Sequence, residues 1–247
     1  MSTLFISDLH LSESRPLITE AFFSFLQNDA KNAETLYILG DLFDAWIGDD
    51  DDRSLASQVA SALKALSDRG TKLFFQHGNR DFLIGHRYAK RCGMQLLPEL
   101  FTLEVADERW LLAHGDQFCT EDIAYQQFRS MVRSPQWQKE LLSKTLEERR
   151  AIATQLREKS KEANSIKAED IMDVTPNEIE KILIDKKCSK LIHGHTHRPA
   201  RHALSLPNLA PQNKLSAERV VLGEWHTTYW FIRQKGKTLE LIEQGIS

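Results

Sequence analysis

The amino-acid sequence predicts an α/β fold, a four-layer α/β/β/α sandwich in which two sheets lie between outer helices. Short apolar runs of strand type end abruptly in Asp, Asn or His, at residues 4–6, 36–39, 73–75, 110–113 and 191–192. Helix-type segments separate the early runs, and strand-type segments return near the C-terminus. A layered α/β protein has this pattern when the loops after its strands converge on one site.

The spacing of apolar residues predicts the type of each element. Between the second and third runs, one helix face carries an apolar stripe that can cover a sheet, formed by Leu55, Val59, Ala62, Leu63 and Leu66. Strand-like runs with turn residues such as Gly236 between them occur at 220–222, 229–232 and 239–242. We therefore expect antiparallel strands to complete the fold.

The length of 247 residues allows one large domain with an insertion. We expect a single domain over residues 1–247 and an inserted helical cap over 120–173. With 41% hydrophobic and 27% charged residues, the composition excludes a disordered chain. No apolar run approaches the roughly 20 residues of a membrane-spanning helix, and the N-terminus lacks a signal-peptide pattern, which predicts a cytoplasmic protein. Cys92, Cys119 and Cys188 have no paired spacing and indicate neither a disulfide framework nor a thiolate zinc site.

Carboxylates follow the first two strand-type runs. Asp8-Leu9-His10 places a carboxylate and an imidazole on the same side of an extended chain, a spacing that can chelate a metal. Taken alone, this pattern is more often a turn-capping Asp beside a surface His. Asp41 follows Gly40 and is our candidate for a carboxylate that bridges two cations. The alternative, a loop Asp that bonds backbone amides, fits Asp44 better.

The later runs are followed by an amide and by imidazoles. Asn79 offers a neutral oxygen ligand, and Arg80 offers a guanidinium suited to phosphate. His114 follows the fourth run, and three alternating imidazoles follow the fifth, at His193, His195 and His197. These imidazoles are the strongest local indication of a metal site. Four other histidines lie outside such patterns and are expected to be structural or exposed: His77, His86, His202 and His226.

The ordered motifs DLH, GDLFD, GNRD, HGD and HGHTH resemble those of the calcineurin-like metallophosphoesterase superfamily, over nearly the whole chain. The resemblance implies a metallophosphoesterase sandwich that holds two Mn²⁺ ions. It assigns one ion to Asp8, His10, Asp41 and His197, and the other to Asp41, Asn79, His114 and His195. Oxygen and imidazole ligands suit Mn²⁺, although Zn²⁺ and Fe²⁺ share them. Catalytic roles fall on Asp41, Asn79, Arg80 and His195, with Arg80 standing where the wider superfamily usually has a His.

Within the superfamily, residues 7–11 and 78–82 and the long segment before His193 resemble the pyrophosphatases of bacterial lipid A synthesis. The resemblance implies hydrolysis of UDP-2,3-diacylglucosamine to UMP and 2,3-diacylglucosamine 1-phosphate (lipid X). It also implies a peripheral membrane protein on the cytoplasmic side of the inner membrane. Substrate contacts are expected at Asn79, Arg80, Asp122, Ser160, Asn164, Lys167 and His195, with Tyr125 and Arg157 as neighbours.

The expected insertion has its own charge pattern. Residues 129–167 hold ten Lys and Arg against five Glu, a balance of +5 that leaves −8 for the rest of a chain whose net charge is −3. One helix face would carry Arg157, Ser160, Asn164 and Lys167. The charged residues of 147–150 are expected to form a solvated helix face, and those of 49–52 a solvated turn. Apolar residues could pack helices together or line an acyl pocket: Ile123, Phe128, Met131, Val132, Ile152, Leu156, Ile171 and Met172.

Two other classes of function stay open at this point. A metallophosphodiesterase acting on a soluble nucleotide or on nucleic acid would use the same metal centre, although the negative net charge argues against nucleic acid. A non-catalytic scaffold of this fold should have lost metal ligands, which this sequence retains. No Gly-x-Ser-x-Gly or Walker motif supports a serine hydrolase or a P-loop NTPase, and nothing indicates an obligate protein partner.

Overall fold

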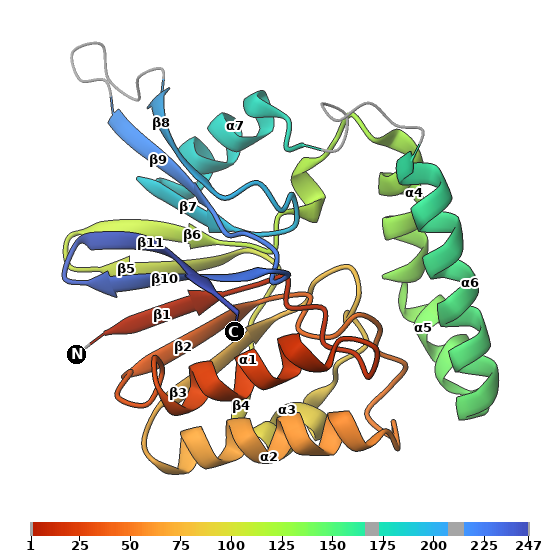
Figure 1. The fold of residues 1–247 in the computed structure, drawn as a ribbon. Coiled ribbons are helices and arrows are strands. Elements are labelled where there is room, and N and C mark those ends of the chain that lie inside the picture. The colour runs from red at the N-terminus through yellow and green to blue at the C-terminus, as the bar shows by residue number, and fades with distance from the viewer. Residues whose placement is uncertain (1, 166–172, 207–214, 247) are drawn as a thin grey trace.

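Two β-sheets face each other in the computed structural model, which describes residues 2–165, 173–206 and 215–246 (Figure 1). The first sheet has the strand order β11-β10-β1-β2-β3-β4. Its strands are β1 (Thr3–Ile6), β2 (Thr35–Leu39), β3 (Lys72–Gln76), β4 (Met94–Leu96), β10 (Thr228–Lys235) and β11 (Thr238–Gly245). The second sheet has the order β5-β6-β7-β9-β8. Its strands are β5 (Phe101–Val105), β6 (Glu108–Leu112), β7 (Lys190–His193), β8 (Ala200–Leu206) and β9 (Leu215–Val221).

Helices connect the parallel strands of the first sheet, as the sequence predicts. β1, β2, β3 and β4 pair in parallel, and the helices between them are α1 (Pro16–Gln27), α2 (Ser54–Asp68) and α3 (His86–Cys92). The apolar stripe of α2 is confirmed, because Leu55, Val59, Leu63 and Leu66 are buried. The expected C-terminal antiparallel strands are confirmed for β10 and β11, whereas residues 220 and 221 belong to β9 of the other sheet.

Strand alternation places one apolar layer between the sheets and another beneath the helices. Along β1, Leu4 and Ile6 pack with α1 and α2, while Phe5 points to the opposite face and packs in the cluster that contains Trp110 and Ile192 of the second sheet. The helix α7 (Pro176–Lys186) packs on the outer face of the second sheet through Ile179 and Leu183. The predicted α/β/β/α sandwich is therefore confirmed.

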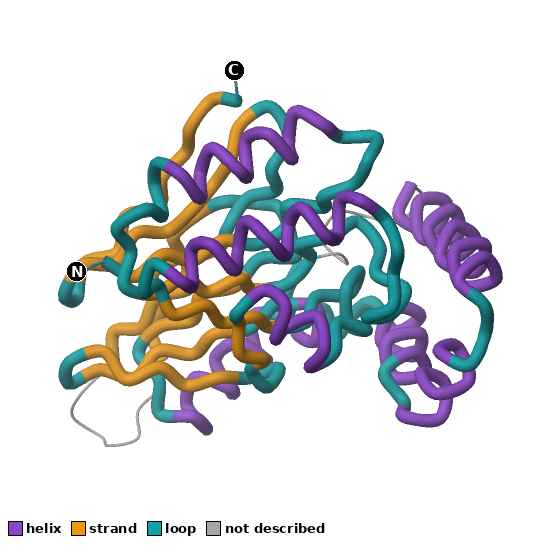
Figure 2. Tube along the Cα trace, turned by 90° about the horizontal axis from the view of Figure 1, so that it is seen from below, coloured by secondary structure: helices purple, strands orange, loops and turns teal. Residues whose placement is uncertain are grey.

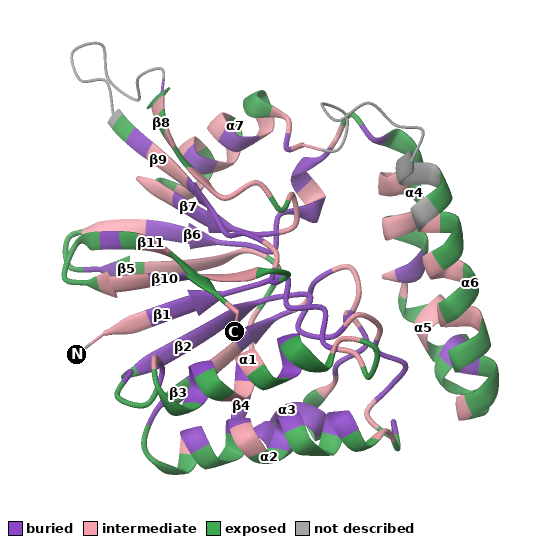
Figure 3. Cartoon of the chain, in the orientation of Figure 1, coloured by how far each residue is buried: buried purple, intermediate pink, exposed green. Residues whose placement is uncertain are grey.

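Three helices stand to one side of these layers, in both views of the chain (Figures 1 and 2). They are α4 (Ile123–Val132), α5 (Pro135–Leu142) and α6 (Leu146–Ser165). Most of their residues are exposed or half-buried, whereas the strands β1, β2 and β7 are mostly buried (Figure 3). We refer to these three helices as the side helices, and whether residues 120–173 form a cap over a substrate stays a prediction.

The expectation that the charged residues of 49–52 and 147–150 are solvated was wrong for Asp51 and Arg149, which are buried. Asp51 and Arg149 are each 5% exposed, while Glu147, Glu148 and Arg150 are exposed as expected. Arg149 donates hydrogen bonds to both carboxylate oxygens of Asp50, at 2.6 and 2.7 Å, and to the carbonyl of Ile47 at 2.9 Å. Helical charge spacing could not reveal this contact, because the partners lie about a hundred positions apart in the sequence.

No described helix is both long enough and apolar enough to cross a membrane.

Candidate metal centre

The predicted ligand residues lie in loops that follow the carboxyl ends of five strands. Asp8 and His10 follow β1, Asp41 follows β2, and Asn79 follows β3. The remaining three come from the second sheet, where His114 follows β6 and His195 and His197 follow β7. Because β1, β2 and β3 are parallel, as are β6 and β7, these loops meet at one edge of the two sheets.

Several of these residues have an uncommon backbone conformation. Non-glycine residues rarely adopt positive φ angles, which cost conformational energy and concentrate at functional sites. Among the described residues, those with φ between 50° and 68° are Asp8, His10, Asp41, Ala106, Lys187, His195 and His197. All but two of these are predicted ligands, so the backbone of the site is held in a conformation that local sequence preference alone would not select.

The side chains form two overlapping clusters of potential ligand atoms. Asp8, His10 and His197 offer atoms that all lie within 4.8 Å of one another, and the same is true of Asp8, Asp41 and His114. Asp41 also reaches both groups, since its carboxylate oxygens lie 3.8 Å from His10 Nδ1 and 3.7 Å from His114 Nε2. Asp8 is thus common to both clusters, and the role of Asp41 as the bridging carboxylate stays a prediction.

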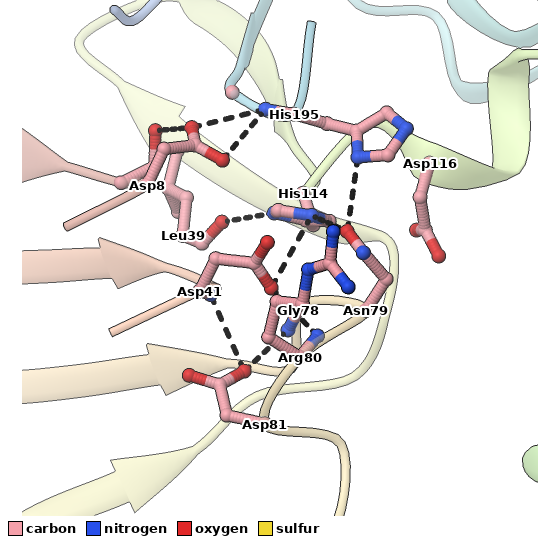
Figure 4. Close-up of polar contacts among 12 residues, drawn as sticks. Asp8, Leu39, Asp41, Gly78, Asn79, Arg80, Asp81, His114, Asp116 and His195 are labelled. Atoms are coloured by element: carbon pink, nitrogen blue, oxygen red, sulfur yellow. Dashed lines mark hydrogen bonds and ion pairs between the residues drawn. The ribbon is translucent and has the colours of Figure 1, made fainter. Parts of the chain in front are cut away.

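The Asn79 side chain lies close to two imidazoles, those of His114 and His195 (Figure 4). Its amide oxygen is 2.9 Å from His114 Nε2 and 3.0 Å from His195 Nδ1. The second ring nitrogen of His114, Nδ1, lies 2.8 Å from the carbonyl oxygen of Leu39. A hydrogen bond from Nδ1 to this carbonyl orients the ring and leaves Nε2 facing the cluster, as in metal-binding histidines.

The donor set fits a metal cation. Asp8, Asp41, His10 and His114 are at most 6% exposed, and His10 Nδ1 has no hydrogen-bond partner among the described residues. Nε2 of His10 faces Nε2 of His197 at 3.3 Å. Burial opposes protonation of His197, but hydrogen bonds to Asp8 and Glu224 raise its pKa to about 10. Carboxylate oxygens and imidazole nitrogens gathered at one point are the donor types that a first-row divalent metal cation takes.

Thiolates do not contribute to this donor set. Cys119 lines the cavity at the site, but burial raises the pKa of its thiol to about 12. All three cysteines are free and buried, which confirms the expectation that they form no disulfide.

Two glycines of the motifs are required by close approach. A Cβ atom at Gly78 would lie 2.1 Å from Asp41 Oδ1, and one at Gly194 would lie 2.1 Å from Asp8 Oδ2. Real Cβ atoms do not approach other atoms so closely, so any side chain at these positions would displace a carboxylate of the site.

Known proteins share this arrangement of motifs. Residues 1–199 match the family described as calcineurin-like phosphoesterase. The chain belongs to this family. The chain is also 50% identical over 241 residues to a UDP-2,3-diacylglucosamine hydrolase of Cellvibrio japonicus, with 98% of each chain covered. It is 49% identical to the proteins of that name from Serratia proteamaculans (98% of this chain, 99% of the relative) and Escherichia coli O7:K1 (98% of each). The predicted relationship to the diacylglucosamine pyrophosphatases is thereby confirmed.

Sequence reasoning missed the roles of three carboxylates that contact other residues of the site. Asp81 accepts hydrogen bonds from the backbone N–H groups of Leu42 at 2.7 Å and Gly78 at 2.9 Å, and so joins the loops after β2 and β3. Asp116 accepts from the Tyr125 hydroxyl at 2.8 Å. Glu224 lies 3.1 Å from His197 Nδ1. Asp81 and Asp116 stand within the quoted GNRD and HGD motifs, whereas Glu224 has no motif that could have identified it.

A polar cavity of about 240 Å³ opens at the clustered residues. It brings together most of the predicted substrate contacts, because its walls include Asn79, Arg80, Asp122, Tyr125, Ser160 and His195. Asp122 also accepts a hydrogen bond from the backbone N–H of Tyr125 at 3.1 Å and caps α4. The side chain of Asn164 and the whole of Lys167 lie outside the described residues.

An adjoining apolar cavity, also of about 240 Å³, lies between the side helices and the core. Its apolar walls include Trp46, Phe82, Leu83, Phe128, Trp137, Ile152 and Leu156. It shares Asn79, Arg80, Tyr125 and Ser160 with the polar cavity, and Arg157, paired with Asp44 at 2.5 Å, lines it too. Of the apolar residues predicted to line a pocket or pack helices, Ile123 and Met131 are instead 63% and 50% exposed. Ile171 and Met172 lie outside the described residues.

Proposed function

We propose that this chain hydrolyses the pyrophosphate bond of UDP-2,3-diacylglucosamine and releases UMP and 2,3-diacylglucosamine 1-phosphate (lipid X). The observation that carries the proposal is the junction of the polar cavity, with its clustered ligand residues, and the apolar cavity. A substrate with a pyrophosphate next to acyl chains needs both environments in contact. Relatives about 50% identical over nearly their whole length carry the name of this activity.

Two Mn²⁺ ions would be held by the residues that the family motifs assign. Asp8, His10, Asp41 and His197 would hold one, and Asp41, Asn79, His114 and His195 the other. When bound, such a pair lowers the pKa of a water molecule and neutralises charge on the phosphoryl oxygens. The oxygen and imidazole donors favour Mn²⁺ by ligand type, and metal analysis of the purified protein would test the choice.

Arg80 would bind the pyrophosphate. It lines both cavities, and its buried Nε has no hydrogen-bond partner among the described residues. A guanidinium at this position can stabilise the negative charge that develops on the leaving phosphate, but it cannot supply a proton near neutral pH. Protonation is not required, because the departing phosphate monoester has a second pKa of about 6 and leaves as an anion.

The side helices would act as the substrate-binding cap of residues 120–173. Phe128, Ile152 and Leu156 would contact acyl chains in the apolar cavity, while Asp122, Ser160 and Arg157 would contact the sugar and phosphate. The basic balance of +5 over residues 129–167 would draw this face to anionic lipid. We accordingly place the protein at the cytoplasmic face of the inner membrane as a peripheral protein.

The decisive experiment incubates the Mn²⁺-loaded protein with UDP-2,3-diacylglucosamine and measures UMP release. The control substrates are UDP-glucose, which lacks acyl chains, and a small chromogenic phosphodiester. We expect the diacylated substrate to have by far the highest kcat/KM. Equal turnover of the soluble substrates would instead support a phosphodiesterase acting on a soluble nucleotide, and absence of turnover on all of them would support a scaffold.

A further inference from the structure

A third cavity lies next to the polar cavity, at the loop that follows β7. It has a volume of about 200 Å³, and its polar lining consists of Asp173, Thr196, Arg198, His202 and Arg219. We call it the basic cavity. It shares Thr196 and Arg198 with the polar cavity and shares no described residue with the apolar cavity. The three cavities therefore follow one another in the order apolar, polar, basic.

This order matches the parts of the proposed substrate. A molecule with acyl chains in the apolar cavity and its pyrophosphate in the polar cavity must place its nucleoside beyond the pyrophosphate. The basic cavity adjoins the polar cavity through Thr196 and Arg198, residues that the apolar cavity does not touch.

The charged groups of the basic cavity form a donor–acceptor–donor array. Asp173 contributes a carboxylate, with Oδ2 3.3 Å from Arg198 Nη1 and Oδ1 3.5 Å from Arg219 Nη1. Both distances exceed the 2.7–2.9 Å or so of a strong charge-assisted hydrogen bond. Asp173 Oδ1 also accepts the backbone N–H of Val174 at 2.7 Å, which holds the carboxylate in place. A carboxylate has further lone pairs and a guanidinium has five N–H donors, so the array can still take a ligand.

Two side chains of this cavity have unused hydrogen-bonding capacity. The Arg219 side chain is only 13% exposed, and Asp173 is the one carboxylate with which it pairs among the described residues. A guanidinium has five N–H donors, so most of those of Arg219 have no carboxylate partner in the described part of the chain. The Thr196 hydroxyl is buried without a hydrogen-bond partner in the part of the chain that the structure describes. Native proteins seldom leave buried polar groups unsatisfied, which indicates that a polar ligand completes this site.

We propose that the basic cavity binds the uracil base of the nucleotide half of the substrate; this inference rests on the proposed function. The imide edge of uracil presents a carbonyl, an N–H and a second carbonyl. This acceptor–donor–acceptor order is complementary to Arg198, Asp173 and Arg219. The Asp173 carboxylate accepts the N3–H of uracil, whereas it repels an inorganic anion and faces an unprotonated acceptor at N3 of cytosine. Arg219 and Asp173 are thus specificity-determining residues for the base.

Direct binding separates this inference from the activity. Titration calorimetry of the metal-loaded protein with UMP, CMP, N3-methyl-UMP and inorganic phosphate compares ligands that differ at the base edge. We expect UMP to bind at least about tenfold more tightly than CMP and N3-methyl-UMP, because each of these leaves the carboxylate without its donor. Phosphate should bind independently of the base-edge residues.

Variants locate the discrimination. Asp173→Asn should reverse or abolish the preference for UMP over CMP, because an amide can present a donor to N3 of cytosine. Arg219→Gln should weaken UMP more than inorganic phosphate. The matched control is Arg201→Gln on β8, because Arg201 pairs with Glu218 at 2.6 Å and does not line the cavity. This control should retain the wild-type ratio of UMP to CMP affinity.

The outcomes distinguish the two hypotheses. Equal affinity for UMP, CMP and N3-methyl-UMP would overturn the uracil site, and so would an unchanged UMP-to-CMP ratio in both Asp173→Asn and Arg219→Gln. Loss of phosphate binding parallel to that of UMP in Arg219→Gln would identify an anion site instead. Failure of the protein to hydrolyse UDP-2,3-diacylglucosamine despite selective UMP binding would overturn the proposed substrate while leaving the uracil site intact.

Discussion

Asp41 is a carboxylate that faces histidines of both proposed ligand sets. Its Oδ1 accepts the backbone N–H of Arg80 at 2.8 Å, and its oxygens face both His10 and His114. We predict that Asp41→Ala abolishes turnover and reduces bound metal, because the carboxylate faces residues of both proposed ligand sets. His10→Ala, which affects one set, should be milder. Turnover and metal content of both variants test this, and near-normal activity with two bound metals in Asp41→Ala would disprove a shared role.

Arg80 is the one arginine whose side chain lines both the polar and the apolar cavity among the described residues. We predict that Arg80→Ala lowers kcat by about 10²–10³, the usual cost of removing a group that stabilises transition-state charge. Arg80→His should not restore it. The measurement is kcat as a function of pH for wild type and both variants. An acidic-group limb that is present in wild type, absent in Arg80→Ala and regained in Arg80→His would show that position 80 acts as an acid.

At the scale of elements, Arg149 of α6 is one of the residues that attach the side helices to the core, together with core contacts of Leu141 and Trp137. Arg149 is buried and donates to Ile47, Lys144 and Asp50. We predict that Arg149→Met lowers the free energy of unfolding by about 2–3 kcal/mol, because buried carbonyls lose their donor. It should also raise KM for the lipid substrate by loosening the apolar cavity. Chemical denaturation and steady-state kinetics measure the two effects.

The neighbouring Arg150→Met is the matched control for this contact. Arg150 is exposed and pairs with exposed Asp52 and, at 3.8 Å, with buried Asp51, which keeps its closer partner Arg53. Removal of Arg150 should therefore change the unfolding free energy by no more than about 1 kcal/mol. Equal destabilisation by the two variants would show that the contact of Arg149 with the loop before α2 has no special role.

The same contact predicts a pH dependence. The hydrogen bonds from Arg149 hold the pKa of Asp50 below its ordinary value. A carboxylate with a lowered folded-state pKa stabilises the fold above its unfolded pKa, about 3.9, and that contribution is lost as the pH falls through the folded pKa. The melting temperature of Asp50→Asn should therefore lie below that of wild type at neutral pH and converge with it in acid. A difference that persists below both pKa values would contradict this linkage.

At the scale of the whole molecule, charge and exposed apolar residues are unevenly distributed. Residues 129–167 carry +5, and exposed apolar residues on α4 include Ile123 and Met131. We predict that the protein binds vesicles containing anionic phospholipid, that binding weakens as salt rises, and that Ile123→Ser with Met131→Ser reduces it. Vesicle co-sedimentation measures this. Leu17→Ser is the control, because Leu17 is 62% exposed but lies on α1. An equal loss in the control would exclude a specific membrane-facing surface.

The alternation of strands and helices and the positions that meet at the centre follow from local features of the sequence. Strand-type runs and the motif residues after them are local features, and parallel strands bring their carboxyl ends to one edge. His10, Asn79 and His197 could therefore be named from the sequence, although their metal-binding roles remain predictions.

Contacts between residues that are distant in the sequence became visible only in the folded chain. Two contacts join segments that lie far apart along the chain, the pairing of Arg149 with Asp50 and the contact of Glu224 with His197. The burial of Asp51 also depends on how distant elements pack. The cavities are likewise formed by side chains from several loops and helices at once. Local periodicity encodes which face of an element is apolar, but a cavity and a buried ion pair depend on how several elements pack together in three dimensions.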